Sequence, residues 1–297
     1  MAFDFYFAGT QAPETDVLLK DLNCNILKSY VNDKKSIEKW FEYKRNGWKG
    51  KLLIDNGAFT VHRKGGSVNI DDYIKWLNDN IDLFDYAIAL DDIPGKWGER
   101  KTTEEVALSP QKTFENYLYM VEHVIKPNKL LPVFHMGESF EWLEKYLKLP
   151  DLKYICISGN KELTNAQREE WYEKCFYVIK HSSNPNIQTH CLGSATLSNA
   201  IKFPFTSMDA TSWIMTGANG NILTDIGAVY VGNIESINKL PVDAKTTILK
   251  LLSKYGITLE QVTTDYKARM LYNIHYLYEK SLSTSYQGIG FKKRSLF

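Results

Sequence analysis

The feature of this sequence that most constrains its fold is a regular alternation of short apolar runs with longer helix-like stretches. Each run is rich in β-branched and aromatic residues, and most end in a small or polar cluster, as strands do. Eight such runs occur, at residues 3–9, 51–59, 85–92, 130–137, 153–159, 186–193, 204–210 and 228–233. Strands that alternate with helices form parallel β-α units, so the pattern predicts a parallel sheet covered by helices.

The stretches between the runs carry helix start signals. Ser109-Pro110 predicts a helix with Pro110 in its first turn. Thr164 and Gln167 have the spacing of a capping box. The expected helices cover residues 71–81, 109–125, 139–148 (from Ser139), 164–180 and 194–202 (from Ser194). Two further helical stretches follow the last run, and we expect 243–254 to be the eighth barrel helix and 259–282 an added cap.

The number and character of the runs favour an α/β fold of the (β/α)8 TIM barrel type with a C-terminal helical extension at about residues 243–282. The runs are nearly continuously apolar, as strands covered on both faces are. The alternative, an open doubly wound sheet, is disfavoured because neither G-x-G-x-x-G after a strand nor G-x-x-x-x-G-K-[ST] occurs. A barrel alone reaches about 250 residues, so we predict a single domain over residues 1–297.

Composition and charge exclude several classes of protein. Thirty-six Lys and Arg stand against thirty-five Asp and Glu, so any binding of nucleic acid must come from a local patch. The four cysteines form no C-x-x-C or C-x-C pair, and we predict neither a metal nor a cofactor. The first residues lack a basic signal-peptide region, and no apolar run approaches the length of about 18 residues that a membrane span needs. We therefore expect a cytoplasmic protein without a membrane partner.

The candidate site follows from what ends each predicted strand, because barrel enzymes place their active sites there. One run ends at Asp55, another at Asp91 and Asp92, and a third at Asp209. A fourth ends at His135, and His190 is a candidate for the pocket wall. An Asp at the end of an apolar strand costs burial energy unless it is paired. Any one of them could be a loop or helix cap, but several at one mouth indicate a catalytic constellation.

Six strand-end motifs occur in order within residues 1–233. They are Asp55-Asn56-Gly57-Ala58-Phe59, Leu90-Asp91-Asp92, Phe134-His135-Met136-Gly137, Gly159, Leu192-Gly193 and Asp209. The ordered set resembles the tRNA-guanine transglycosylase superfamily, and most closely its DNA-directed branch, the 7-deazaguanine DNA transglycosylases. The corresponding motifs of that superfamily are Asp-Ser-Gly-Gly-Phe, a Phe-Asp-Glu-like step, a Val-Gln-Gly-Gly-like end, a base-contacting glycine, a Gly-rich end and a nucleophilic Asp.

The resemblance implies a role for each matched residue. Asp209 would be the nucleophile, and Asp55 would act first as acid and then as base. The base edge would be read by Asp91 or Asp92 together with Asn56, His135 and the Gly159 peptide. Either Phe59 or Trp213 would stack on the base, with ordinary packing as the alternative for both.

Departures from the family pattern bear on the substrate. No Cys-rich cluster can hold the zinc of the tRNA-directed members, and too little chain remains after residue 233 for their RNA-reading domain. DNA is therefore the expected partner. His135 stands where the family has Gln, and Ala58 where it has Gly, so the accepted base need not be guanine.

The leading hypothesis is an enzyme that flips a base out of DNA, cleaves its N-glycosidic bond and exchanges it for a free 7-deazaguanine-type base. The first alternative is a DNA glycosylase that leaves an abasic site, which would suit antiviral defence against a modified viral base. The second is a metal-dependent barrel hydrolase, although no H-x-H or H-x-x-E-H spacing appears. The third is an inactive barrel that only binds nucleic acid. His62, Arg63 and Lys64 lie near the mouth, where they either contact phosphates or belong to a solvated loop.

Overall fold

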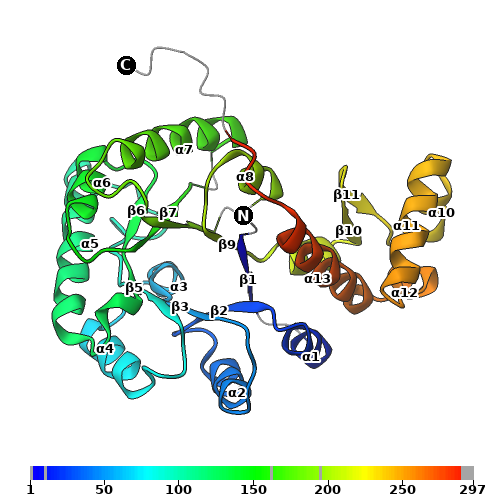
Figure 1. The fold of residues 1–297 in the computed structure, drawn as a ribbon, viewed down its shortest axis with the longest axis horizontal. Helices are drawn as coiled ribbons and strands as arrows, with labels where there is room; N and C mark the ends of the chain where they lie inside the picture. The colour runs from blue at the N-terminus through cyan, green and yellow to red at the C-terminus, as the bar shows by residue number, and fades with distance from the viewer. Residues whose placement is uncertain (1–2, 10–11, 161–162, 194–195, 289–297) are drawn as a thin grey trace.

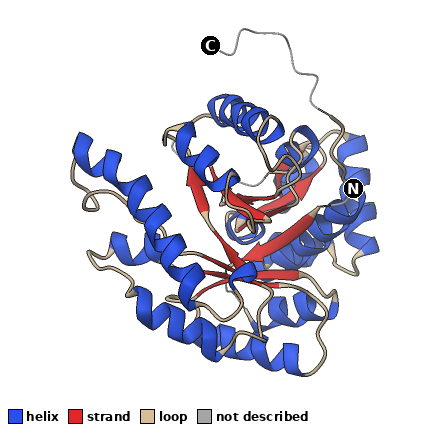
Figure 2. Ribbon diagram, turned by 60° about the vertical axis from the view of Figure 1, so that its left-hand side comes forward, coloured by secondary structure: helices blue, strands red, loops and turns tan. Residues whose placement is uncertain are grey.

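The computed structural model describes residues 3–9, 12–160, 163–193 and 196–288. Its centre is a nearly closed, barrel-like parallel sheet of nine strands in the order β5-β4-β3-β2-β1-β9-β8-β7-β6, with helices around the outside (Figures 1 and 2). The strands are β1 (Asp4–Ala8), β2 (Asn25–Ser29), β3 (Leu52–Asp55), β4 (Tyr86–Ile88), β5 (Leu130–Leu131), β6 (Val133–His135), β7 (Tyr154–Ser158), β8 (Gln188–Leu192) and β9 (Ser207–Ala210). The molecule is therefore a TIM-like α/β barrel.

Pro132 explains why the sheet has nine strands and not eight. It separates β5 from β6, and a proline has no N–H to donate to a strand ladder. The Pro132 carbonyl still accepts a hydrogen bond of 2.8 Å from the Cys156 N–H. Because β5 pairs with β4 and β6 pairs with β7, the single run 130–137 bridges the two edges of the sheet.

One strand prediction is wrong, and one barrel strand is missing from the prediction. The run 228–233 does not enter the barrel, because β11 (Gly227–Tyr230) pairs with β10 (Asn221–Thr224) in a separate antiparallel hairpin. The place between β1 and β3 belongs to β2, whose polar residues conceal it in the sequence. One of them, Lys28, is buried, and its ammonium group donates a hydrogen bond of 2.6 Å to the Gly9 carbonyl.

The helices around the barrel confirm some start signals and correct others. The helices are α1 (Pro13–Asp21), α2 (Lys34–Arg45), α3 (Ala58–Arg63), α4 (Ile70–Asp79), α5 (Thr103–His123), the 3-10 turn η1 (Pro127–Lys129), α6 (Phe140–Leu147), α7 (Asn165–Lys180), α8 (Leu197–Lys202) and α9 (Ser212–Ala218). Ser139 caps α6, and Thr164 forms a capping box with Gln167 at α7, as predicted.

Two helix starts differ from the prediction. A capping box of Thr102 and Glu105 starts α5 well before Ser109, so Pro110 lies inside the helix. The described part of α8 has Thr196 as its cap, and the predicted start, Ser194, lies outside the described residues.

The two long C-terminal helices have the opposite roles to those expected: the later one, and not the segment 243–254, packs on the barrel. They are α10 (Ile234–Asn238), α11 (Val242–Lys254), α12 (Leu259–Thr264) and α13 (Tyr266–Ser283). The helix that packs on the barrel is α13, where Arg269 Nε donates to the Gly217 carbonyl at 2.7 Å and Asn273 Oδ1 accepts from the Leu223 N–H at 2.8 Å. In Figure 1, α10, α11 and α12 lie to the side of the barrel with the β10–β11 hairpin. The reason is apolar surface, since α13 buries residues on most of its circumference and α11 buries only Ile248 and Leu252.

The inside of the barrel is a separate small core. It consists of Tyr6, Ala8, Leu27, Leu53, Ile88, Leu131, Val133, Tyr154 and Cys156. Successive strand residues alternate between the inside and the helix-covered outside. The inward positions that follow Leu53, Val133 and Cys156 are therefore Asp55, His135 and Ser158, at the C-terminal mouth.

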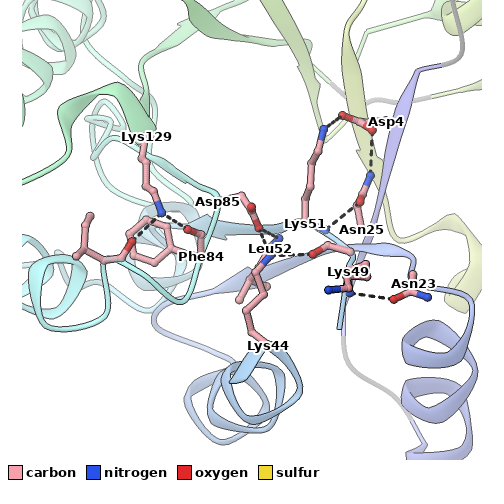
Figure 3. Close-up of polar contacts among 12 residues, drawn as sticks. Asp4, Asn23, Asn25, Lys44, Lys49, Lys51, Leu52, Phe84, Asp85 and Lys129 are labelled. Atoms are coloured by element: carbon pink, nitrogen blue, oxygen red, sulfur yellow. Dashed lines mark hydrogen bonds and ion pairs between the residues drawn. The ribbon is translucent and has the colours of Figure 1, made fainter. Parts of the chain in front are cut away.

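The opposite, N-terminal end of the barrel is tied by charged side chains (Figure 3). Lys51 Nζ lies 2.5 Å from Asp4, and Lys44 Nζ lies 2.8 Å from Asp85. Asp85 also accepts the Leu52 N–H at 2.8 Å, and Lys129 donates to the carbonyls of Ile81 and Phe84. Active sites of barrel enzymes lie at the C-terminal mouth and not at this end. We therefore assign these contacts a structural role: they connect neighbouring strands and helices of the barrel. None of the described helices is long and apolar enough to cross a membrane.

Candidate active site

Asp55 ends β3 and is held by the turn that follows it. The Gly57 N–H donates to Asp55 Oδ2 at 3.2 Å. Gly57 has φ +80°, and a Cβ there would lie 2.8 Å from Ser29 Oγ and from Val31 Cβ. Only glycine fits this turn without strain, so the Asp-Asn-Gly sequence fixes where the Asp55 carboxyl group lies.

Asn56 links the end of β3 to the loop after β4. Its amide nitrogen donates to the Ala89 carbonyl at 2.8 Å and to Asp91 Oδ1 at 3.0 Å. Its carbonyl oxygen accepts the Ala58 N–H at 2.8 Å, and the side chain is buried. The hydrogen bond from the Asn56 amide to Asp91 Oδ1 therefore orients the Asp91 carboxylate, and the other bonds of Asn56 hold its own side chain in place.

His135, at the end of β6, lies between two carboxylates. Its Nε2 donates to Asp91 Oδ2 at 2.9 Å, and its Nδ1 donates to Glu138 Oε1 at 2.8 Å. Burial alone would lower the pKa of His135, but Asp91 and Glu138 outweigh it and raise that pKa to about 10. Burial likewise opposes ionisation of Asp91, yet the hydrogen bonds from His135 and Asn56 hold its pKa below the usual value. At neutral pH the group is therefore an imidazolium between two carboxylates.

Asp55 differs sharply from Asp91. Burial, followed by the negative charges of Asp91 and Asp209, raises the pKa of Asp55 to about 7. The hydrogen bond from Gly57 reduces this effect without cancelling it. At pH 7 Asp55 is therefore about half protonated and can donate a proton, while Asp91 is ionised.

Asp209, on β9, is the third carboxylate, and its Oδ1 is fixed from two sides. The Gly193 N–H donates to Oδ1 at 2.7 Å, and His190 Nε2 lies 3.3 Å from the same oxygen. A carboxylate only accepts, so Nε2 carries the hydrogen, and the Ser207 hydroxyl bonds the other ring nitrogen of His190. Ser207 is in turn hydrogen-bonded to the Tyr154 hydroxyl. Among the described residues, no partner occupies Asp209 Oδ2.

Cys156, in the barrel interior, lies close enough to all three carboxyl groups to be affected by their charges. Its pKa is raised well above the usual value by burial, and then by Asp209, Asp55 and Asp91 in that order. One thiol inside the barrel therefore experiences all three charges. Asp55 ends β3, Asp91 follows β4 and Asp209 lies on β9, and that the three form one catalytic site stays a prediction.

Gly159 and Phe59 lie at the edge of this group. Gly159 directly follows β7, whose last residue Ser158 is in register with His135. Phe59, on α3, is exposed, and its ring centroid lies 5.6 Å from that of Trp97. Phe59 is therefore accessible to a ligand, whereas Gly159 is half-buried.

Two of the proposed residues lie elsewhere. The backbone of Asp92 anchors α5, because its N–H donates to Thr113 Oγ1 at 3.0 Å and its carbonyl accepts from Ser109 at 2.7 Å. Its carboxylate lies 4.0 Å from Lys112 Nζ on that helix. Trp213 belongs to the core, where it is 1% exposed and its Nε1 donates to the Ala8 carbonyl at 3.0 Å. Trp213 is therefore unable to stack on a substrate, and Asp91 is the carboxylate of the pair that joins the site.

Sequence reasoning missed Glu138 and Trp97. Glu138 follows His135 by three residues in the loop after β6, and this spacing was a signal for a second partner of the imidazole. Trp97 lies between Gly95 and Gly98, which both have positive φ. It belongs to a polar loop without helix or strand periodicity, so the sequence does not predict where its side chain lies.

A groove on the outer surface is not part of this site. It lies between α6 and α7 and is lined by residues such as Phe140, Leu147 and Val178. Because Asp55, Asp91 and Asp209 all lie at the mouth, we place the chemistry there. The described residues contain no group of three or more His, Cys, Asp and Glu side chains arranged to hold a metal ion.

Comparison with known proteins does not identify the chain: no protein-family model matches it, and no curated protein is significantly similar to it.

Proposed function

We propose that this chain cleaves the N-glycosidic bond of a nucleobase in DNA, with Asp209 as nucleophile and Asp55 as proton donor. The observation that carries the proposal is the different surroundings of two carboxyl groups: Asp55 accepts the Gly57 N–H, whereas Asp209 Oδ1 accepts from the Gly193 N–H and lies 3.3 Å from His190 Nε2. Burial and neighbouring negative charges raise the pKa of Asp55 to about 7. Glycosidic bond cleavage requires one carboxyl group as acid and another as carboxylate.

The first half of the reaction uses both groups. The C1′–N bond breaks, and its electron pair leaves with the base, which takes the Asp55 proton. Positive charge develops on the sugar and is met by Asp209, whose oxygen forms an ester bond with C1′. The hydrogen bonds from Gly193 and His190 to Oδ1 orient the carboxylate so that Oδ2 faces the sugar.

The second half restores the enzyme. In base exchange, Asp55, now a carboxylate, takes a proton from an incoming 7-deazaguanine-type base. The freed nitrogen lone pair attacks C1′, and the bond from C1′ to Asp209 breaks. The target nucleotide must first leave the helical stack, because its C1′–N bond is otherwise out of reach.

The Asp91–His135–Glu138 group suits recognition of the base. Asp91 has accepting positions beyond those used by Asn56 and His135, and can take an N–H from a base edge. The imidazolium keeps Asp91 ionised, so this acceptor stays available when Asp55 is protonated. Gly159 follows Ser158, which is the register partner of His135, and its peptide supplies a further polar contact to the base.

Hydrolysis of the glycosyl ester is the second candidate reaction, and the chemistry of His135 in the wall of the site supports it. His135 is tied between two carboxylates, so the wall differs chemically from the glutamine of the resembled family. Such a wall need not retain a second base. Water would then attack the ester and leave an abasic site, as a DNA glycosylase does.

The test is incubation of modified and unmodified DNA with and without free 7-deazaguanine, followed by mass spectrometry of released bases and by alkali treatment. Intact strands that gain the added base establish exchange. Alkali-labile breaks without an added base establish hydrolysis. Absence of base release from every DNA, with turnover on tRNA, would refute the choice of DNA.

A further inference from the structure

A pair of exposed aromatic rings stands beside the candidate site. Phe59 is 56% exposed and Trp97 is 51% exposed. Their rings meet edge to face, with an interplanar angle of 87°, and the Arg63 guanidinium lies 5.0 Å from the centroid of the Trp97 ring. Large aromatic rings are normally highly buried, so two of them in mutual contact at the surface form a ligand-binding candidate.

This aromatic pair continues directly from the catalytic carboxyl groups. Phe59 is on α3, which begins three residues after Asp55. Trp97 lies in the segment that follows Asp91. Figure 1 shows α3 within the outline of the barrel, not among the helices that surround it. A molecule held in the mouth would therefore meet these rings with its adjoining part.

The same two segments carry a concentration of positive charge. Their exposed cations are Arg63, Lys64, Lys96, Arg100 and Lys101. Three acids, Glu99, Glu104 and Glu105, lie in the second segment, and Glu105 accepts from the N–H and hydroxyl of Thr102 at the start of α5. Residues 58–66 and 95–105 together thus have a formal excess of +2, in a chain whose formal net charge is +1. We call Phe59, Trp97 and these five cations the basic aromatic rim.

We propose that the basic aromatic rim binds an unpaired stretch of the DNA strand next to the target base. Aromatic rings stack on bases of any sequence, and Lys and Arg neutralise the adjoining phosphates. In a duplex the faces of the bases are covered by their neighbours, so exposed rings select a strand that is single or locally opened. That the bound strand is DNA rests on the function proposed above. That a single nucleic-acid strand binds here rests on the residues of the basic aromatic rim.

The experiment measures binding of a fluorescein-labelled, unmodified single-stranded DNA to the full chain by fluorescence anisotropy at several salt concentrations. Trp97→Ala is expected to weaken binding about tenfold while leaving the slope of log K against log salt unchanged, since one lost base stack leaves every phosphate neutralised as before. The double variant Lys96→Ala/Arg100→Ala is expected to reduce that slope by about 0.7 for each phosphate that is no longer neutralised. Tyr266→Ala and Lys250→Ala, exposed positions on α13 and α11, are the matched controls and should bind as wild type does.

Several outcomes would overturn the proposal. These are wild-type affinity in Trp97→Ala, equal affinity of the wild-type chain for duplex and single strand, and tighter binding of RNA of the same sequence. Base release measured on the same proteins separates this proposal from the function. Trp97-dependent DNA binding, with no base release from any modified or unmodified DNA, would leave the rim standing and refute the function. Base release with wild-type binding in Trp97→Ala would refute the rim alone.

Discussion

At the residue scale, the central feature of the molecule is Asp55, a partly buried carboxyl group with a pKa of about 7. Two other carboxylates and loss of water both favour its protonated form. The His135 imidazolium is engaged by Asp91 and Glu138. The site therefore holds one donor proton near two carboxylates.

The rate of base release should depend on pH through Asp55. An acid with a pKa of about 7 is protonated below that pH, so the rate is expected to fall as pH rises through about 7. Asp91→Asn removes one of the charges that raise the Asp55 pKa, and the fall should then begin at lower pH. A rate profile from pH 5 to 9 measures both, and an unchanged midpoint in Asp91→Asn would contradict the coupling.

Stability should show the same pKa without reference to catalysis. The Asp55 pKa is higher in the folded chain than its ordinary value, so the folded state gains stability at low pH and loses it as pH rises through about 7. Asp55→Asn keeps an acceptor for the Gly57 N–H and has no charge to bury. We expect the variant to match wild type at pH 4 and to unfold at a higher temperature than wild type at pH 8. Equal melting temperatures of the variant and the wild type at pH 8 would show that the ionised form of Asp55 does not destabilise the folded chain.

The nucleophile assignment is tested by Asp209→Asn. The amide is nearly isosteric and can still accept from the Gly193 N–H, but it cannot carry the charge that faces the sugar. We expect an unchanged circular dichroism spectrum and a loss of rate far beyond tenfold. Retention of more than about a tenth of the rate, a loss under about 1.4 kcal/mol, would exclude Asp209 as nucleophile.

At the scale of elements, the strand-to-helix turns decide where the site residues lie. The turn after β3 needs Gly57 because of its positive φ and because Ser29 and Val31 leave no room for a Cβ. The turn after α3 contains Gly65, also with positive φ (+76°), but no other atom lies within 4 Å of the place that a Cβ would take. The two glycines share a backbone conformation and differ in their surroundings.

Gly57→Ala and Gly65→Ala therefore form a matched pair. Both variants bear the cost of a left-handed alanine, about 1 kcal/mol. Gly57→Ala must in addition displace Ser29 or Val31, and we expect it to be destabilised by at least about 1 kcal/mol more. Urea denaturation measures both free energies of unfolding. Equal losses would mean that the turn after β3 can relax around the new methyl group.

At the scale of the whole molecule, the barrel depends on a helix that arrives last in the sequence. The contacts of α13 with α9, with β10 and with α1 cover β1 and join the C-terminal helices to the barrel. At the N-terminal end of the barrel, ion pairs such as Lys51–Asp4 connect strands that lie close together in the sheet (Figure 3). Closing the sheet is thus a long-range event that local segments cannot complete.

The contribution of α13 is measured by Ile274→Ala. Ile274 is fully buried, and truncating a buried Ile typically costs about 2–5 kcal/mol. Leu282→Ala, on the same helix but 61% exposed, is the control, and we expect it to change stability by less than about 0.5 kcal/mol. Similar losses in both variants would mean that α13 does not pack on the barrel as described.

The sequence by itself determined the class of fold and the end of the barrel at which the candidate site residues lie. Alternating apolar runs and helices leave little choice but a parallel sheet covered by helices, and parallel strands bring their carboxyl ends together. The position of Asp55, Asp91, His135 and Asp209 at one mouth follows from that. These are local patterns, and they are legible because hydrophobic periodicity is a property of neighbouring residues.

Only the tertiary structure decided how these residues differ from one another. Whether a tryptophan stacks at the mouth or packs in the core depends on the direction of its side chain, and Trp213 and Trp97 are opposite cases. The polar strand β2 and the barrel role of α13 depend on contacts with distant segments, and Lys28 and Asn273 find their partners only in the folded chain. The pKa of Asp55 depends on burial and on charges from two other strand ends. Distances between segments far apart in the chain set all of these properties, and a one-dimensional pattern does not contain them.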